Sequence, residues 1–396
     1  MEKVRYGIIG VGNMGFSHSK SFLEGKVENG VLAAICDLKP EKLERVKALE
    51  GAEKVATFSD YKEMLASGLI DAVIVAVPHY FHPQMSIDAL NAGIHTICEK
   101  PAGVYTKQVK EMNAVAEKSD KLFAIMFNQR TNCIYRKMRE MVQGGELGKI
   151  RRLNWIVTNW YRSQSYYDSG DWRATWRGEG GGVLFNQCPH QLDLLSWITG
   201  MMPKRVRTFC HFGKWHDIEV EDDVTAYLEY ENGATGVFVT STGDTPGTNR
   251  FEILGDRGKL VSERVDKGIV LKFYKLEMPE PEFNATHTAG FGEPKYEVID
   301  VETDGQNPQH VGILNNFSNA VLGLEPLFVD GKEGINGVQL MDSMLLSTWL
   351  DDFVELPIDD ELYLSELQKR VATGRVKEGV REVVLDTEGT YGSTAK

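Results

Sequence analysis

One stretch of the 396-residue chain combines side chains that can transfer a proton with backbone that can turn sharply. The segment GEGGGVLFNQCPHQLDLL (178–195) places Asn186, His190 and Asp193 at positions i, i+4 and i+7 after three consecutive glycines. In a helix this spacing puts all three on one face, and the glycines permit close approach of the backbone to a ligand. His190 could exchange a proton with a hydroxyl while Asp193 orients its imidazole. The alternative is a core helix whose histidine is already satisfied.

A second candidate is the lysine of CEKPAG (98–103), which follows a short apolar run. Oxidation of a secondary alcohol needs a hydride acceptor and a base that removes the hydroxyl proton. A lysine suits the second role when burial and a nearby positive charge lower its pKa towards neutrality. Lys100 lies between Glu99 and Pro101, and the lysine–proline bond is a candidate for the cis form. In isolation Lys100 would be a surface lysine, so its place at the end of a strand carries the argument.

A third candidate is the glycine turn GVGNMG (10–15), which follows a strand-like run and opens a helical one. Such glycines allow a tight turn, close approach to a pyrophosphate and close packing of helix on strand. The expected pyrophosphate-binding residues are Gly10, Gly12, Asn13, Met14 and Gly15. Asp37 ends the next apolar run, where a carboxylate accepts hydrogen bonds from the adenine-ribose diol, which favours NAD. Lys39 keeps NADP as the less favoured alternative.

Further cofactor contacts are expected from the other strand ends, because parallel strands present their carboxyl ends at one edge of a sheet. The loop AVPHYFHP (76–83) follows one such strand, and packed loop histidines are the alternative explanation for its two imidazoles. The expected contacts at the strand ends are Pro78, His79, His82, Glu99, Lys100 and Asn128. Trp172 and Arg173, in the aromatic segment 159–176 near the three glycines, are expected to contact the cofactor as well.

The elements that must position these residues fall into two groups. Short apolar runs at 4–10, 31–37, 71–78, 95–100 and 121–127 alternate with helical patterns at 40–49, 82–93 and 106–119. This alternation is typical of a doubly wound parallel sheet with helices on both faces, an α/β fold. From residue 149 onward, strand-like segments joined by hairpin signals predict an α+β domain with a largely antiparallel sheet. Helices near 308–322 and 334–353 complete it or pack back on the first domain.

The motifs GVGNMG, EKP and GGGxxxNxxxHxxD, in this order, resemble the Gfo/Idh/MocA family of glucose–fructose oxidoreductase and inositol dehydrogenase relatives. The resemblance implies an NAD-binding Rossmann domain at 1–128 and a substrate-binding and oligomerisation α+β domain at 129–396 with an open sheet. It also implies NAD(P)-dependent hydride transfer at a secondary alcohol carbon of a sugar, glycoside or cyclitol. Lys100 and His190 then form the proton-transfer pair, in a homodimer or homotetramer.

The pattern departs from the family at Asn186, where inositol-dehydrogenase-like members carry an aspartate. An amide can position a hydroxyl but does not relay a proton at neutral pH. The NQCPHQLD version resembles a subgroup that includes levoglucosan and glycoside 3-dehydrogenases. Aromatic faces of the segment 159–176 suit pyranose rings, although packing is the alternative for about half of them. The expected substrate-binding residues are Asn186, Asp193, Trp160, Tyr161, Asn249 and His310.

Composition narrows the remaining possibilities. A formal net charge of −13 argues against a nucleic-acid or anionic-membrane partner, and no apolar run is long enough to span a bilayer. Five scattered cysteines without CxxC spacing fit reduced thiols in a cytoplasm. The cluster CHFGKWHDIEVEDD (210–223) contains metal-ligating residue types, but its irregular spacing predicts no metal site.

Two other functions compete with a dehydrogenase. One is a redox-neutral enzyme with tightly bound NAD+, which oxidises a sugar transiently to permit elimination or glycoside cleavage. The other is a nucleotide-binding sensor without catalysis, which the presence of both Lys100 and His190 disfavours.

Overall fold

The computed structural model of the chain describes residues 3–266, 268–377 and 380. Its first sheet is parallel throughout, with the strand order β3-β2-β1-β4-β5-β6. The order reverses between β1 and β4, so the carboxyl ends of these two strands border the crevice in which doubly wound folds bind nucleotides. The strands are β1 (Val4–Ile9), β2 (Gly30–Cys36), β3 (Ala56–Phe58), β4 (Ala72–Val75), β5 (His95–Cys98) and β6 (Phe123–Ile125).

Helices cover this first sheet, and the predicted parallel α/β fold is confirmed. Every residue of β4 is buried, as expected for a strand covered on both faces. The helices are α1 (Asn13–Leu23), α2 (Pro40–Lys47), α3 (Tyr61–Ala66), α4 (His82–Asn91) and α5 (Thr106–Ala116), with a 3₁₀ turn η1 (His79–Phe81) before α4. Strand β3 has three half-buried or exposed residues, and so short a run carries no apolar signal.

The second sheet has nine strands among the described residues, in the order β14-β13-β12-β11-β7-β10-β9-β8-β15. Its neighbours pair antiparallel except β7 and β10, which are parallel. The predicted largely antiparallel sheet is therefore confirmed. The strands are β7 (Ile150–Val157), β8 (Arg205–Phe212), β9 (Glu221–Glu229), β10 (Thr235–Ser241), β11 (Asn249–Gly255), β12 (Gly258–Val265), β13 (Gly268–Leu276), β14 (Tyr296–Asp300) and β15 (Val354–Glu355).

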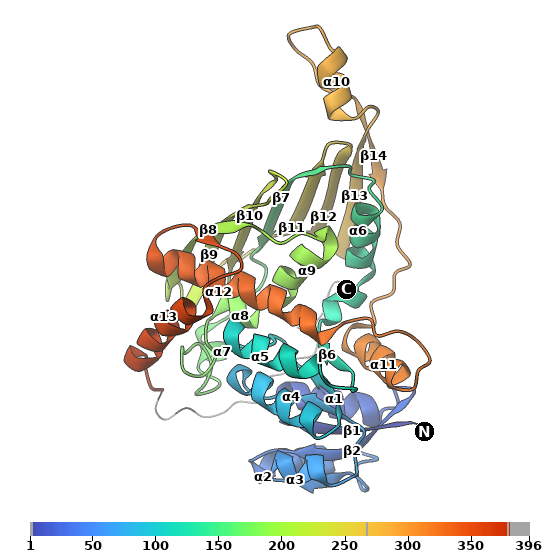
Figure 1. The fold of residues 1–396 in the computed structure, drawn as a ribbon, viewed down its shortest axis with the longest axis vertical. Helices are drawn as coiled ribbons and strands as arrows, with labels where there is room; N and C mark the ends of the chain where they lie inside the picture. The colour runs from blue at the N-terminus through green and yellow to red at the C-terminus, as the bar shows by residue number, and fades with distance from the viewer. Residues whose placement is uncertain (1–2, 267, 378–379, 381–396) are drawn as a thin grey trace.

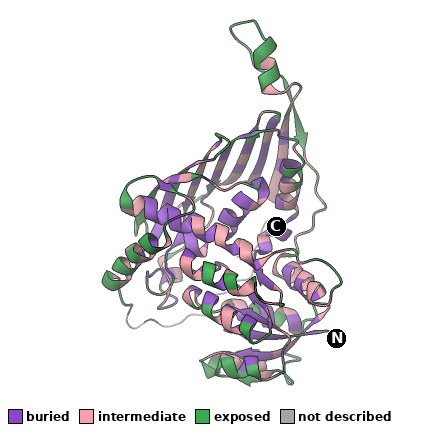
Figure 2. Cartoon of the chain, viewed as in Figure 1, coloured by how far each residue is buried: buried purple, intermediate pink, exposed green. Residues whose placement is uncertain are grey.

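One face of this sheet packs against helices, and the other face is open. The covering helices are α6 (Cys133–Gln143), α9 (Pro189–Thr199) and α12 (Gly334–Leu350) (Figure 1). Side chains alternate accordingly along the strands: Trp155 is buried and stacks on Phe251 with ring centroids 4.2 Å apart, whereas Ile156 is 42% exposed. Figure 2 shows the buried residues concentrated between the helices and the two sheets.

The last helices of the described chain pack against both sheets. Helix α11 (Gln309–Val321) packs back on the first sheet, where the Tyr6 hydroxyl lies 2.8 Å from the Ser318 hydroxyl. Helix α12 lies between the second sheet and α5, and α13 (Asp360–Thr373) packs against both helices. Helix α10 (Glu280–Thr286) stands beyond the sheet at the far end of the molecule (Figure 1). No helix among the described residues is long and apolar enough to cross a membrane.

Candidate active site

The glycine turn between β1 and α1 has no room for a side chain at Gly10 or Gly15. Gly10 has a φ of +84°, and a Cβ there would lie 2.5 Å from the Ala76 carbonyl oxygen. A Cβ on Gly15 would lie 1.9 Å from the Gly10 carbonyl oxygen. Gly12 faces open space, and no side chain caps the N-terminus of α1 at Asn13 and Met14. The free N–H groups of this helix end can therefore receive a phosphate.

Asp37 lies beside this turn, directly after β2. Its Oδ2 accepts a hydrogen bond from the Val11 amide at 2.9 Å, and its Oδ1 accepts one from the Lys39 amide at 3.0 Å. These bonds fix a carboxylate next to the glycine turn, the position of the ribose-binding acid in dinucleotide folds. The turn and Asp37 thus fit a dinucleotide, and a bound NAD would supply hydride transfer at the carboxyl edge of the sheet.

The histidines of the loop after β4 differ in their surroundings. Pro78 precedes η1, and the buried His79 ring lies 5.7 Å from the Trp172 ring. His82 has both ring nitrogens 2.7 Å from main-chain oxygens, those of Pro101 and Val77. Because main-chain oxygens of the protein occupy both nitrogens, the prediction of a cofactor contact for His82 is corrected. Its imidazole connects the loop after β4 to the loop after β5.

Lys100 follows β5, and its peptide bond to Pro101 is cis. The Nζ atom donates a hydrogen bond to the Asn186 carbonyl oxygen at 2.9 Å. Burial lowers the pKa of Lys100, and the negative charges of Glu99 and Glu179 oppose that shift only in part. Lys100 is half-buried, and a lysine with a lowered pKa has the properties required of a general base.

Glu99 is a buried carboxylate paired with a buried histidine. Its Oε1 lies 2.7 Å from the Nε2 of His18 in α1. Burial acts to raise the pKa of Glu99, but the hydrogen bond and charge of His18 outweigh it and lower the pKa to about 2. His310, at the start of α11, stands edge-on to His18 with ring centroids 5.5 Å apart. Burial lowers the pKa of His310 to about 4, so its imidazole is neutral. The structure brings this residue, which the sequence predicts to bind substrate, next to Glu99.

The helix predicted to carry Asn186, His190 and Asp193 on one face is interrupted. Helix α8 (Val183–Asn186) ends at Asn186, and α9 begins at Pro189. Proline suits the first position of a helix because its N–H would be unpaired there, and its ring prevents a preceding helix from continuing. Asn186 and His190 therefore come from two different helices, and the shared face is a correction to the sequence-based prediction.

His190 lies in the first turn of α9 and is 8% exposed. No described residue forms a hydrogen bond with its Nδ1, and its ring stands edge-on to Phe127 with centroids 6.3 Å apart. Burial lowers the pKa of His190 well below its ordinary value, and the charges of Lys100 and His310 lower it further. His190 is thus a neutral imidazole within electrostatic reach of Lys100, able to donate from one nitrogen and accept at the other.

Asp193 has a different role from the one expected. Its Oδ2 accepts from the Nε of Arg130 at 2.8 Å, and its Oδ1 accepts from Nη2 at 2.6 Å. The same guanidinium contacts Glu333, and Arg130 is almost completely buried. Because a buried guanidinium needs a paired carboxylate, Asp193 is committed to Arg130. It is available neither to orient His190 nor to bind substrate.

Asn249 is also committed elsewhere. It opens β11, and its Oδ1 accepts a hydrogen bond from the Trp155 indole of β7 at 3.1 Å. The substrate contact predicted for Asn249 is corrected, because this side chain satisfies a buried indole N–H.

Asn128, in the 3₁₀ turn η2 (Asn128–Thr131), donates to Gln309 at 2.6 Å, and its buried Oδ1 has no partner among the described residues.

The segment before the glycines supplies aromatic rings and a guanidinium. Arg173 lies 4.6 Å over the Trp172 ring and donates to the Tyr166 hydroxyl at 2.9 Å. The Tyr166 hydroxyl in turn donates to Asn186 Oδ1 at 3.0 Å. Trp160 is half-buried against the core, and Tyr161 is 52% exposed. The two expected cofactor contacts at 172 and 173 are thus linked through one hydroxyl to the Lys100 site.

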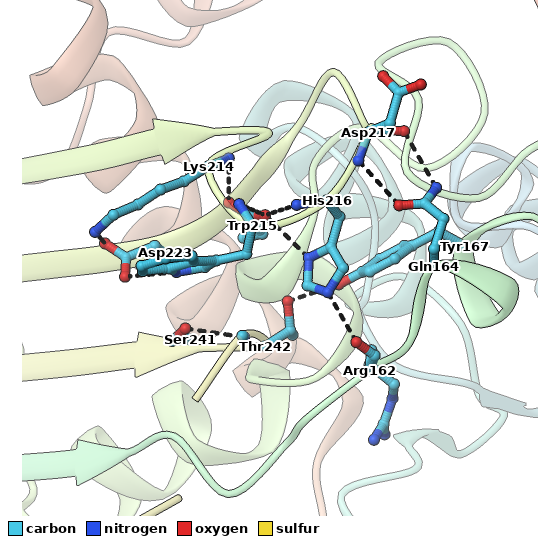
Figure 3. Close-up of polar contacts among 12 residues, drawn as sticks. Arg162, Gln164, Tyr167, Lys214, Trp215, His216, Asp217, Asp223, Ser241 and Thr242 are labelled. Carbon is cyan, nitrogen blue, oxygen red and sulfur yellow. Dashed lines mark hydrogen bonds and ion pairs between the residues drawn. The ribbon is translucent and has the colours of Figure 1, made fainter. Parts of the chain in front are cut away.

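Figure 3 shows how the loop between β8 and β9 holds this segment in place. His216 Nε2 lies 2.8 Å from the Arg162 carbonyl oxygen, and the Tyr167 hydroxyl donates to Thr242 at 2.7 Å (Figure 3). Asp222 is fully buried and accepts hydrogen bonds from the backbone N–H groups of residues 214–216. The cluster at 210–223 therefore builds a hydrogen-bonded loop. In the described ranges, no group of three or more acidic, histidine or cysteine residues is arranged to hold a metal ion.

Glu179 is a site residue that the sequence analysis missed. It is 2% exposed, its Oε2 accepts from the Ala174 amide at 2.6 Å, and its Oε1 accepts from the Asn186 side-chain amide. A glutamate beside glycines is typical of a solvent-exposed loop, so the residue type did not indicate that Glu179 is buried. Its position immediately before the three glycines was the available signal.

Comparisons with known proteins agree with this geometry. Residues 4–127 match the oxidoreductase family with an NAD-binding Rossmann fold, and residues 135–261 match the GFO/IDH/MocA C-terminal domain. A myo-inositol 2-dehydrogenase of Thermotoga maritima is 26% identical over 275 residues, 68% of this chain and 78% of that protein. A glycosyl hydrolase family 109 protein of Shewanella sp. (strain ANA-3) is 30% identical over 200 residues. That match spans 47% of this chain and only 42% of the relative.

The fold also matches a solved structure along nearly its whole length. The WlbA dehydrogenase from Bordetella pertussis, in complex with NADH and UDP-GlcNAcA, is 26% identical. The similarity covers 91% of this chain and 99% of that chain, with a TM-score of 0.75. The glycine turn, the strand order and both domain matches lead to one conclusion: the chain belongs to the Gfo/Idh/MocA family of oxidoreductases, whose Rossmann domain binds NAD.

Proposed function

We propose that the protein is an NAD-dependent dehydrogenase acting on a secondary alcohol carbon of a sugar, glycoside or cyclitol. The observation that carries this proposal is the Lys100 site: a half-buried lysine of lowered pKa at the carboxyl edge of the dinucleotide-binding sheet, with the neutral His190 in electrostatic reach. The similarity to an inositol dehydrogenase and to a dehydrogenase holding a nucleotide sugar supports the substrate class.

In the direction of oxidation, the neutral Lys100 takes the proton of the reacting hydroxyl on its Nζ lone pair. His190 hydrogen-bonds to the same substrate and fixes the orientation of the hydroxyl, which its neutral imidazole allows. In the reverse direction the Lys100 ammonium returns the proton to the alkoxide. His190 is buried and Lys100 is half-buried, so both groups are partly shielded from bulk water during the transfer.

The proposal divides the remaining predicted contacts between cofactor and substrate. The cofactor side consists of the glycine turn, Asp37, Pro78, His79, Asn128, Trp172 and Arg173. We assign His310, Trp160 and Tyr161 to the substrate side. The substrate contact predicted for Asn186 is corrected, because its side-chain oxygen accepts from Tyr166 and its side-chain nitrogen donates to Glu179. Asp37 carries a negative charge where NADP would place its 2′-phosphate, which supports NAD as the working cofactor.

A panel of sugars, glycosides and inositols, each mixed with NAD+ and with NADP+, tests this function through the appearance of reduced cofactor absorbance. We expect a substrate in the panel to reduce NAD+ faster than NADP+, and Lys100→Ala to abolish most of that activity. Turnover of such a compound without involvement of Lys100 would contradict the assignment of the base.

The redox-neutral alternative keeps support from one observation, the 30% identity to a glycosyl hydrolase family 109 protein. In such an enzyme the cofactor returns to NAD+ within each turnover. Consumption of a glycoside without release of NADH would favour it, whereas stoichiometric NADH favours the dehydrogenase.

A homodimer or homotetramer through the open face of the second sheet completes the proposal. Register places Ile156, Tyr227 and Leu254 on this face, and each is at least 37% exposed. Apolar side chains exposed on neighbouring strands are typical of a protein–protein interface. Light scattering of the purified protein, repeated for Ile156→Glu, tests the assembly.

All five cysteines carry free thiols, which suits the reducing cytoplasm as the compartment.

A further inference from the structure

We propose that Glu179 is a positioning residue for Lys100, whose carboxylate acts through Asn186 and through its charge to favour the ammonium form of the lysine. The inference rests on the proposed function, in which Lys100 is the base. It adds a second acid to the site, distinct from Glu99, which follows directly from β5.

Asn186 is held from two sides, and this connects the two residues. Its carbonyl oxygen accepts the Lys100 Nζ hydrogen bond at 2.9 Å, and its side-chain Nδ2 donates to Glu179 Oε1. The side-chain oxygen of Asn186 is occupied as well, by the Tyr166 hydroxyl at 3.0 Å. Asn186 thus has no freedom to rotate, and Glu179 fixes the residue that receives Lys100.

The carboxylate itself is immobilised. Glu179 is 2% exposed, and its Oε2 accepts from the Ala174 amide at 2.6 Å. The amides of Glu179 and Gly180 both donate to the Thr175 carbonyl oxygen, at 2.9 and 3.2 Å. These bonds close the backbone into a turn that carries the carboxylate into the protein. A carboxylate so deeply buried costs free energy unless positive charge stands near it.

That positive charge comes from Lys100 and Arg173. Burial raises the pKa of Glu179, while the charges of Arg173 and Lys100 and the hydrogen bonds from Ala174 and Asn186 lower it. Arg173 is itself engaged with the Tyr166 hydroxyl and the Trp172 ring. Lys100 is therefore the cation whose charge changes during the reaction. The negative charge of Glu179 stabilises Lys100 when the lysine becomes an ammonium.

Other charged and titratable groups face the same two residues. The groups that face Lys100 are Glu99 after β5, Arg162 and Arg173 in the segment before the three glycines, His79 in η1, His82 in α4, Cys188 before α9, His190 in α9 and His310 in α11. Those that face Glu179 are Tyr166, Tyr167, Arg173, Glu221 and Lys377. Glu99 is already paired with His18 at 2.7 Å, which leaves Glu179 to respond to Lys100.

The proton balance follows from these positions. When the substrate O–H bond breaks, its proton forms an N–H bond on Lys100. The C–H bond on the same carbon breaks with it, a bound NAD+ would accept that hydride, and the alcohol becomes a carbonyl. The new ammonium would be unfavourable in a buried site without a nearby negative charge. Glu179 provides that charge without itself taking the proton.

The test is the pH dependence of kcat/KM for alcohol oxidation by the full-length enzyme with NAD+. Lys100 must be deprotonated to act as base, so kcat/KM rises as pH increases through its pKa. Glu179→Gln removes a negative charge, destabilises the ammonium and shifts this rise to lower pH, by about one unit. NADH affinity, measured by fluorescence titration, stays as in the unchanged protein.

Two further variants keep the result interpretable. Asn186→Asp adds a carboxylate to the same place and shifts the rise to higher pH, and the Glu179→Gln/Asn186→Asp double variant returns it towards the original position. Asp342→Asn is the matched control: Asp342 is a buried carboxyl that accepts from the Thr106 amide at 2.9 Å, and its substitution leaves the pH of the rise unchanged.

An unchanged pH profile in both Glu179→Gln and Asn186→Asp would overturn the inference and leave Glu179 a purely structural acid. That result is separate from failure of the proposed function. If Lys100→Ala retains full turnover, Lys100 is not the base, whatever Glu179 does. If Glu179→Gln does not fold, the single Asn186→Asp shift decides the question.

Discussion

The Lys100 Nζ atom donates a 2.9 Å hydrogen bond to the main-chain oxygen of Asn186, across 86 positions of sequence. This bond joins the end of the fifth strand of the parallel sheet to the last residue of the short helix after the glycines. It places the expected base against the element that precedes His190. The contact is therefore the point at which the cofactor-binding domain and the second domain meet in the candidate site.

Two glycines of the dinucleotide turn are expected to respond differently to the same small change. A Cβ added by Gly12→Ala meets no atom within 4 Å, and the cost is the backbone ψ of −149°, so the melting temperature falls less than it does for Gly15→Ala. The added methyl group occupies the approach to the helix end, and NADH affinity falls by on the order of tenfold. Thermal melting and fluorescence titration measure both effects.

Gly15→Ala supplies the contrast. Its Cβ would lie 1.9 Å from the Gly10 carbonyl oxygen, so strand and helix must separate and stability falls by about 1–3 kcal/mol. Equal melting temperatures for the two alanine variants would contradict this description of the turn.

Asp37 is expected to set the choice between NAD and NADP. Asp37→Ser removes the negative charge that opposes a 2′-phosphate, so the ratio of kcat/KM for NAD+ over that for NADP+ falls by at least about tenfold. The Val11 amide keeps an acceptor in the serine hydroxyl, which limits structural damage. Steady-state kinetics with both cofactors checks the ratio, and a ratio that does not move would remove Asp37 from the cofactor site.

Arg130→Met is expected to destabilise the fold by about 3–5 kcal/mol, because it leaves the buried Asp193 carboxylate without its partner. Chemical denaturation measures the loss. Arg130→Met combined with Asp193→Leu removes both charges and should regain much of that stability. If the double variant is less stable than Arg130→Met, the pair is not the source of the effect.

Glu221 is expected to make stability depend on pH. Burial raises its pKa from 4.5 to about 8, although the Gly182 and Leu184 amides act in the opposite direction. Between these two values the folded protein holds a proton that the unfolded chain releases. Its contribution to stability is therefore greatest below pH 4.5 and decreases as pH rises towards 8. Between pH 6 and 9 the melting temperature should fall further for the unchanged protein than for Glu221→Gln. Parallel curves would contradict the raised pKa.

Local patterns made part of this structure predictable. The glycine turn, Asp37 and Lys100 lie within or directly beside strands, so their chemistry and spacing point to one sheet edge. Pro189 was visible in the sequence, yet helical spacing alone placed Asn186 and His190 on a single helix. The proline rule for helix starts would have separated them.

Long-range pairing explains what remained hidden. Arg130 lies 63 residues from Asp193, and its partner could not be inferred from spacing. Nor does sequence distinguish a buried Glu179 from a solvated one, because its burial depends on Ala174 and Asn186 folding around it. Strand β14 escaped prediction because all of its residues are exposed and it lacks an apolar alternation.

The most direct test of the central claim is the rate of NAD+ reduction by Lys100→Ala with the best substrate of the sugar and cyclitol panel. We predict a loss in kcat on the order of 10²-fold or more, because Lys100→Ala removes the group that takes the hydroxyl proton. NADH affinity should remain unchanged. Full turnover by Lys100→Ala would contradict the assignment of Lys100 as the base of this dehydrogenase.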